Sequence, residues 1–253
     1  MDLWMNDLYI NRNIPYLFNT HIYEYDIKSA GLSLIKEYNL LDKLEINKLE
    51  NLDKPRQVVR IGLLQKNNKE LLDNLKESFK KARKLFFDAN GLTDSDIISI
   101  KKDAIFTTKR CEINKVTENI DFREKNMYTS FILLNSKIEL YYSDNKLDIK
   151  GLSEENINYH KNYMIDFINK FFYKMENDSI DHVLLFMKRF IDKYKRRELD
   201  IGYYRSFDFH SRYIETGDIN IEFMEYPNSR KEFVDITYNF QNVLLKLISI
   251  PLS

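Results

Sequence analysis

A segment with the pattern of a β-hairpin, residues 96–108, constrains the fold of this chain more than any other stretch. At its centre stands a charged trio, Lys101-Lys102-Asp103. Four apolar residues flank the trio: Ile98, Ile100, Ile105 and Phe106. β-Branched and aromatic residues favour strands, and a short charged segment between two such runs favours a turn. We therefore predict two paired strands with Asp103 at their tip.

The composition excludes several classes of protein. With 253 residues, of which 43% are hydrophobic, the chain can bury a core as one large domain or two small ones. Lys+Arg and Asp+Glu number 39 each, so attraction to a polyanion must come from local patches. A single cysteine, Cys111, forms no internal disulfide, and no apolar run approaches the roughly 20 residues that span a bilayer. The first residues lack a secretory signal pattern, so we expect a cytoplasmic protein without membrane contact.

Upstream of the hairpin, the pattern predicts a strand followed by helices. Alternating residues 22–26 form a strand that runs into Asp26, and helical spacing begins directly afterwards with Ser29 as the N-cap. A further short helix is predicted over 42–54 and a long one over 68–89, which Asn90-Gly91 ends as a left-handed cap. Asp26 therefore stands at a strand-to-helix junction.

Downstream of the hairpin, the pattern predicts more strands and then helices. Strands are expected at 111–116, 128–134 and 138–142, with a turn at 143–145. Helices are expected over 153–175, 180–197 and 233–250, with a strand at 219–224. We predict an α+β fold, in which residues 1–152 form an antiparallel sheet backed by helices and residues 153–253 are mostly helical.

Asp26 and Asp103 are the candidate catalytic and metal-binding residues. If their strands are neighbours, the two carboxylates supply the hard oxygen ligands that Mg²⁺ or Mn²⁺ prefers. Two-metal phosphoryl transfer needs such ligands, because one ion activates the attacking oxygen and the other stabilises the leaving one. Each aspartate taken alone is also a common turn or capping residue.

Three segments resemble the palm of family B DNA polymerases. Residues 25–35, YDIKSAGLSLI, resemble the first palm motif, in which an aspartate precedes Ser-Leu-Tyr-Pro-Ser-Ile. Residues 99–106, SIKKDAIF, are similar to the third motif, Asp-Thr-Asp-Ser-Ile. A weaker likeness relates residues 137–139 and 145–151 to the Lys-x-Tyr segment and the following Lys-Gly turn. The resemblance covers residues 22–152 and implies that the antiparallel sheet of residues 1–152 is palm-like.

The resemblance implies roles for several residues and also shows departures from the family. Asp26 and Asp103 match the aspartates that hold the catalytic magnesium ions, and Lys137 matches a position near the nucleic-acid backbone. Lys101 replaces the first aspartate of the third motif, Glu139 replaces a tyrosine near the primer, and Gly31 replaces the tyrosine that packs against the incoming sugar.

The fingers of the family have no clear counterpart in this sequence. The separation of 77 residues from Asp26 to Asp103 is short for such a domain, and no helix carries the Lys-x-x-x-Asn-Ser-x-Tyr-Gly pattern. Arg56, Arg60 and Lys66 are the candidates there for triphosphate contacts, and Lys101 and Lys137 are further candidates for binding nucleotide or nucleic acid.

Three functions follow from these residues. The first is magnesium-dependent nucleotidyl transfer on a nucleic-acid template, in a protein of a virus or mobile element. The second is a palm-derived protein that has lost catalysis and serves in a viral replication, transcription or virion assembly. The third is a metal-dependent nuclease that uses the same carboxylates. Whether a partner subunit supplies the missing fingers stays open.

Overall fold

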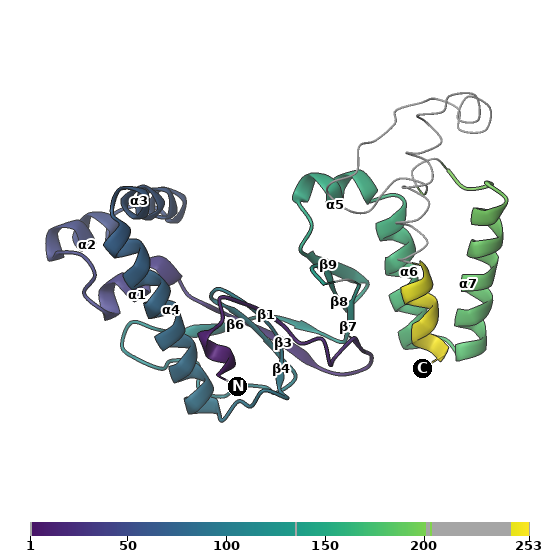
Figure 1. Cartoon of the computed structure of the whole chain (residues 1–253), viewed down its shortest axis with the longest axis horizontal. Helices are drawn as coiled ribbons and strands as arrows, with labels where there is room; N and C mark the ends of the chain where they lie inside the picture. Colours follow the sequence, from purple (N-terminus) through teal and green to yellow (C-terminus); the bar gives the residue numbers. More distant parts are fainter. Residues whose placement is uncertain (1, 135, 201–202, 204–243, 253) are drawn as a thin grey trace. The chain divides into compact units, whose positions relative to one another are not determined.

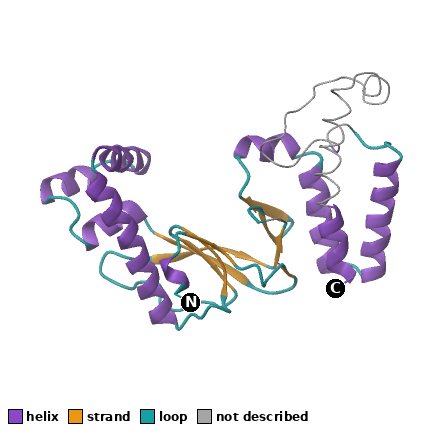
Figure 2. Ribbon diagram, in the orientation of Figure 1, coloured by secondary structure: helices purple, strands orange, loops and turns teal. Residues whose placement is uncertain are grey.

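The computed structural model describes residues 2–134, 136–200, 203 and 244–252 (Figure 1). They form two compact units. Unit 1 comprises Met1–Ile14 and Thr20–Tyr128, and unit 2 comprises Pro15–Asn19 and Thr129–Ser253. Each unit contains an antiparallel sheet and helices, so the predicted α+β class is confirmed (Figure 2). The helical region expected from residue 153 onward belongs to unit 2, together with four strands.

A five-stranded antiparallel sheet forms the centre of unit 1. Its strands follow the order β1-β4-β5-β3-β6. Their bounds are β1 Leu8–Ile10, β3 Ile22–Ile27, β4 Ile97–Lys101, β5 Ala104–Thr107 and β6 Phe122–Tyr128. β4 and β5 are the predicted hairpin, and Lys102 and Asp103 form the turn between them. β5 also pairs with β3, so the strand that carries Asp26 lies beside the hairpin that carries Asp103.

Four helices join β3 to β4 in unit 1. Their bounds are α1 Ala30–Glu37, α2 Lys43–Glu50, α3 Lys54–Asn67 and α4 Lys69–Asn90. Side-chain caps begin three of them, because Asp42, Asp53 and Asn68 each accept a hydrogen bond from a backbone N–H of the first turn. α4 ends at Gly91, whose φ of +56° confirms the predicted left-handed cap.

The segment Lys54–Asn67, which contains Val58, forms α3, and Pro55 lies in its first turn. Pro55 therefore begins a helix, a position at which its missing N–H costs nothing.

The core of unit 1 lies between the sheet and its helices. Tyr25 and Ile27 of β3 are buried in it, as are Ile100 of β4 and Ile105 of β5. Phe86 of α4 stacks on Phe122 of β6, with 4.1 Å between ring centroids. One face of the sheet is thus committed to apolar packing, and successive residues of a strand point to opposite faces.

Unit 2 combines a four-stranded antiparallel sheet with helices. The strand order is β2-β7-β8-β9, with the bounds β2 Tyr16–Leu17, β7 Ser130–Leu133, β8 Glu139–Ser143 and β9 Lys146–Lys150. The helices are α5 Glu154–His160, α6 Met164–Asn177 and α7 Ile180–Lys195, followed by helical residues 244–249 and the 3-10 turn η4 Ile250–Leu252. Tyr142 of β8 stacks on Phe172 of α6 at 5.1 Å, which joins the sheet to the helices.

The structure differs from the sequence prediction at several places. Residues 111–116 are not a strand, because side chains hold their backbone: Tyr25 Oη accepts from the Cys111 N–H and Asn90 Oδ1 from the Ile113 N–H. β6 was not predicted, since its polar sequence FREKNMY lacks β-branched residues. The helix expected over 153–175 is divided into α5 and α6 by a turn in which the Tyr163 N–H donates to the His160 carbonyl.

Part of the prediction lies outside the described residues. The strand expected at 219–224 falls there, as does the first part of the helix expected over 233–250, whereas 244–249 are helical. Within the described part of the chain, no helix has the length and apolar character needed to cross a membrane.

Gly151 provides a test of how unit 2 is built. Its φ is +94°, and a Cβ there would lie 2.1 Å from the Lys137 carbonyl oxygen. We expect Gly151→Ala to lower the free energy of unfolding by about 3 kcal/mol, because both the backbone conformation and this close approach exclude a methyl group. Urea unfolding followed by circular dichroism measures the change.

Gly62→Ala is the matched control. Gly62 lies inside α3 with nothing within 4 Å of its Cβ position, so alanine should raise the free energy of unfolding by up to about 1 kcal/mol. Equal unfolding midpoints for wild type and Gly151→Ala would contradict the contact with Lys137.

Candidate functional site

The polar face of the unit 1 sheet carries the predicted site. Tyr25 and Ile27 point into the helix-covered core, so strand alternation places Glu24 and Asp26 on the opposite face. Asp26 is opposite Arg123 of β6, and Lys101 is opposite Ala104. Tyr25 pairs with Ile105, the neighbour of Ala104, so Asp26 directly follows the last paired residue of β3 with β5. Lys101, Ala104, Asp26 and Arg123 thus lie on four neighbouring strands.

Two cationic side chains hold the Asp26 carboxylate. Arg123 Nε lies 2.6 Å from Asp26 Oδ1 and its Nη2 lies 3.2 Å from Oδ2. Lys125 Nζ lies 3.5 Å from Oδ2. Burial alone raises the pKa of Asp26, but the hydrogen bonds and charges of Arg123 and Lys125 outweigh it and hold the pKa below its ordinary value. Asp26 is therefore ionised at neutral pH.

Glu24 is a second carboxylate on this face, and its position is fixed by three donors. Lys125 Nζ lies 3.2 Å from Oε1, while Asn126 Nδ2 and Tyr128 Oη lie 2.6 and 2.8 Å from Oε2. The residue is 1% exposed. Buried charges need such partners, because desolvation penalises an uncompensated one heavily. Lys125 thus bridges Glu24 and Asp26.

Asp103 lies within electrostatic reach of Asp26. Burial raises the pKa of Asp103 above its ordinary value, and the negative charge of Asp26 raises it further, against the Asp103 backbone N–H and the charges of Lys125 and Lys102. Arg123 also interacts electrostatically with both aspartates. Two acids that are 77 residues apart in sequence therefore share one electrostatic environment.

The turn that carries Asp103 is strained and braced. Lys102 has a φ of +55°, a conformation that L-residues adopt at a cost of roughly 1–2 kcal/mol. The buried guanidinium of Arg83, on α4, donates to the Lys102 carbonyl at 2.6 Å, to the Trp4 carbonyl at 2.8 Å and to Asp7 at 2.9 Å. The Lys102 N–H in turn donates to the Asp7 carbonyl. Such strain persists where the surrounding structure over-determines it, as at many functional sites.

Charges on the polar face are balanced. Arg123 and Lys125 pair with Asp26, Lys125 also pairs with Glu24, and the charges of Lys125 and Lys102 act on Asp103. Asp26 and Asp103 are the kind of ligand that Mg²⁺ prefers, and the charge of Asp26 disfavours ionised Asp103 in a way that a cation would relieve. Among the described residues, however, no group of three or more His, Cys, Asp or Glu could hold a metal ion.

The other predicted site residues lie elsewhere. Arg56, Arg60 and Lys66 are exposed on α3. Arg56 pairs with Asp53 and Arg60 with Glu45, and none of the three contributes to the pKa shifts of Asp26 or Asp103. In unit 2, Lys137 is exposed between β7 and β8, where its carbonyl adjoins Gly151. Glu139 is fully buried on β8 opposite Lys150.

Sequence reasoning missed four residues that shape the site: Glu24, Arg83, Arg123 and Lys125. Glu24 was identifiable, because it lies two positions before Asp26 on the same strand and therefore on the same face. Arg83 was hidden in the Lys-rich helix α4, which reads as a solvated surface. Arg123 and Lys125 lie on the strand that the sequence did not predict.

Arg83 gives the first test of this site. We expect Arg83→Met to lower the free energy of unfolding by about 3 kcal/mol, because three acceptors lose a charged donor that is fully buried. Chemical unfolding measures this change in the free energy of unfolding. Lys84→Met, at an exposed position that pairs with Asp88 on the same helix, should change stability by less than about 0.5 kcal/mol. Similar effects of the two substitutions would exclude the bracing role.

The pKa of Asp26 gives a second test. In Arg123→Gln, burial is opposed by Lys125 alone, so we expect this pKa to rise when followed by carbon-13 NMR of the carboxyl group. A depressed folded-state pKa adds stability that is present above the ordinary value of 3.8 and is lost as the pH falls through the folded value. The variant should therefore be less stable than wild type at pH 7, and the difference should shrink at low pH.

Arg110→Gln is the control for this titration. Arg110 pairs with Glu124 on the same strand as Arg123 and does not act on Asp26. An unchanged Asp26 pKa in Arg123→Gln, or an equal rise in both variants, would mean that the guanidinium of Arg123 does not set it.

Comparison with known proteins places the chain in a phage family. No curated protein matches it. A family described as the Bacteriophage PBS1 gene 130 protein matches residues 1–253, which is the whole of the sequence. The chain belongs to this family of phage proteins.

Proposed function

We propose that this phage protein carries out magnesium-dependent nucleotidyl transfer on a nucleic-acid template, as family B DNA polymerases do. The observation that carries the proposal is the pairing of β3, which carries Asp26, with β5 of the hairpin that carries Asp103 at its turn. Burial raises the pKa of Asp103, and the charge of Asp26 raises it further. The chain order also supports it: strand and Asp26, then helices, then a hairpin with Asp103 at its turn.

The carboxylates of the site are suitable ligands for a divalent ion, provided that Arg123 frees an oxygen of Asp26. Asp26 and Asp103 would hold the ion, which supplies charge neutralisation at the phosphates and activation of the attacking oxygen. Both oxygens of Asp26 accept from Arg123, so Arg123 must release at least one of them. Arg123 is 43% exposed at its side chain, which leaves it room to turn away toward an incoming phosphate.

The proposed reaction joins a strand to a nucleotide. A hydroxyl oxygen at the strand end forms a bond to the α-phosphorus of a nucleoside triphosphate, the bond to pyrophosphate breaks, and the hydroxyl proton passes to solvent. Lys101, Arg123 and Lys125 border the two carboxylates and favour the negatively charged phosphates. Arg56, Arg60 and Lys66 on α3, and Lys137 in unit 2, are proposed as further contacts to nucleotide or nucleic acid.

A second candidate function is a palm-derived protein without catalysis. It is favoured by the two contacts of Arg123 with Asp26 and by Lys125, because these side chains already supply the positive charge that an ion would bring. Replacing an ion by fixed cations keeps the sheet stable while removing the Lewis acid. Such a protein would bind nucleic acid or a partner protein within a viral replication, transcription or virion assembly.

Primer extension tests the first function. We expect wild type to incorporate deoxy- or ribonucleotides with Mg²⁺ or Mn²⁺, and Asp26→Asn and Asp103→Asn each to reduce incorporation by at least about 100-fold. Asp73→Asn, at an exposed position on α4, is the matched control and should retain full activity. Strand degradation without incorporation would instead assign these carboxylates to a nuclease.

Binding of Mn²⁺ followed by electron paramagnetic resonance separates the two candidates. For the enzyme, Mn²⁺ binds wild type, Asp103→Asn weakens binding, and Arg123→Gln strengthens it because a competing cation is removed. For the protein without catalysis, wild type binds no Mn²⁺ at the millimolar level while nucleic-acid binding is retained. Binding of Mn²⁺ that is equal in wild type and Asp103→Asn would contradict the metal role of Asp103.

A further inference from the structure

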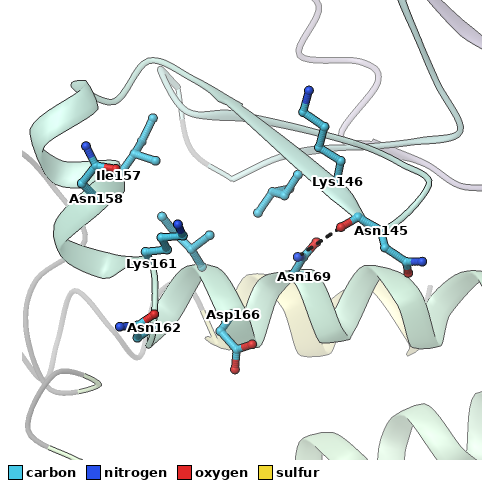
Figure 3. Close-up of a pocket in the computed structure, with 10 residues that line it drawn as sticks. Asn145, Lys146, Ile157, Asn158, Lys161, Asn162, Asp166 and Asn169 are labelled. Carbon is cyan, nitrogen blue, oxygen red and sulfur yellow. Dashed lines mark hydrogen bonds between the residues drawn. The ribbon is translucent and has the colours of Figure 1, made fainter.

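Unit 2 contains an open pocket between the β8–β9 hairpin and two helices. Its volume is about 630 Å³, within the range of small-molecule sites. Residues of the hairpin turn, of α5 and the segment that follows it, and of α6 line the pocket (Figure 3). All of these elements belong to unit 2, so the pocket does not depend on the carboxylates of unit 1.

The hairpin side of this pocket is fixed in place. Asp144 and Asn145 both have positive φ, at 47° and 62°, which gives the two-residue turn typical of a tight β-hairpin. Asn169 Nδ2 on α6 donates to the Asn145 carbonyl at 3.4 Å, and Tyr142 Oη donates to Asn145 Oδ1 at 3.0 Å. The turn is thereby tied to the helix below it (Figure 3), and the pocket exists before any ligand binds.

The lining combines three chemical characters. Aliphatic side chains that also pack against the core form an apolar surface: Leu147, Ile157 and Ile165. Four asparagines contribute amides that both donate and accept: Asn145, Asn158, Asn162 and Asn169. Two lysines also line the pocket, Lys146 on the hairpin and Lys161 after α5 (Figure 3).

The charge of the pocket is positive. Neither Lys146 nor Lys161 forms an ion pair with any residue that the structure describes. Asp166 is the acidic residue of the lining, and its carboxylate accepts from Lys170 at 2.6 Å and points away from the hairpin (Figure 3). The unneutralised charge therefore belongs to the lysines, which favours an anionic ligand.

One side chain of the lining, Asn169, has a buried acceptor atom. Asn169 Oδ1 is buried and has no hydrogen-bond partner among the described residues. Its orientation is fixed, because the Asn145 carbonyl can only accept and so Nδ2 must face it. Leaving such an atom unpaired costs about 1–3 kcal/mol, and a ligand donor recovers this cost only when Asn169 turns Oδ1 into the pocket.

We propose that this pocket binds a nucleoside phosphate. Its flat, largely apolar base would lie against the aliphatic surface, its edge would meet the asparagine amides, and its phosphate would meet Lys146 and Lys161. Paired donors and acceptors of asparagine match base edges, adenine above all. The nucleotide comes either from a free pool or from the end of a nucleic-acid strand.

Isothermal titration calorimetry on the full chain tests this inference, with AMP, adenosine and inorganic phosphate as probes. We expect one AMP to bind per chain, at least about tenfold more tightly than either fragment, since both ends of the nucleotide are recognised. Lys146→Gln and Lys161→Gln should each weaken AMP binding by about 5- to 20-fold. Lys188→Gln, at an exposed position on α7, is the control and should bind AMP as wild type does.

Asn169→Leu separates base recognition from charge. It should weaken AMP binding by about tenfold and leave the weak binding of phosphate unchanged. Melting temperatures of all variants verify the fold. A 5′-phosphorylated oligonucleotide that binds more tightly than AMP, with the same dependence on both lysines, identifies a strand end as the source, whereas equal or weaker binding identifies a free nucleotide.

Two results would overturn the inference. One is AMP binding no tighter than phosphate, which would reduce the pocket to a general anion site. The other is AMP binding that neither lysine substitution changes, which would place the nucleotide elsewhere. The outcome is independent of primer extension, because no residue of this pocket belongs to the carboxylate site of unit 1.

Discussion

The ion pair between Asp26 and Arg123 is the interaction on which the polar face of unit 1 depends. Glu24 and Asp26 on β3 and Asp103 in the β4–β5 turn would repel one another if no cation stood among them. Arg123 and Lys125, both from β6, supply that charge through contacts of 2.6–3.5 Å. Ionised Asp26 is therefore stabilised by a positive partner. A side chain provides it in this state, and a divalent ion would have to take over the same task.

A second constraint acts on the geometry of the site. Arg83 reaches from α4 to the backbone of three segments, and one of its acceptors is the carbonyl of the strained turn residue Lys102. A lysine at this position could satisfy fewer acceptors, because its ammonium lacks the planar fork of a guanidinium. The position of Asp103 is thus set by a helix that packs on the opposite face of the sheet. This linkage explains why a fully buried charge is kept in the core of unit 1.

The sequence contained enough information for about half of this arrangement. β3, α4 with its glycine cap and the β4–β5 hairpin were predicted correctly, because their side chains follow the periodicity that their structure demands. β6 was not predicted, because several of its residues form charge pairs with β3. Such pairing leaves no periodic apolar pattern in the sequence. The pocket of unit 2 was not predicted from the sequence for another reason. Its lining comes from a turn, a loop and two helices, and no local pattern reveals that they converge.

Both candidate sites follow from one property of the composition. With 39 cationic and 39 acidic residues, the chain has no general attraction for a polyanion. A phosphate group is therefore expected to bind where positive charges locally outnumber negative ones. On the unit 1 sheet the carboxylates already have cations beside them, and phosphate binding there requires that Arg123 leave Asp26. At the unit 2 pocket Lys170 already neutralises Asp166, so Lys146 and Lys161 attract an anion without any rearrangement. Nucleotide binding at the unit 2 pocket should therefore depend less on divalent ions than nucleotide binding at the unit 1 sheet.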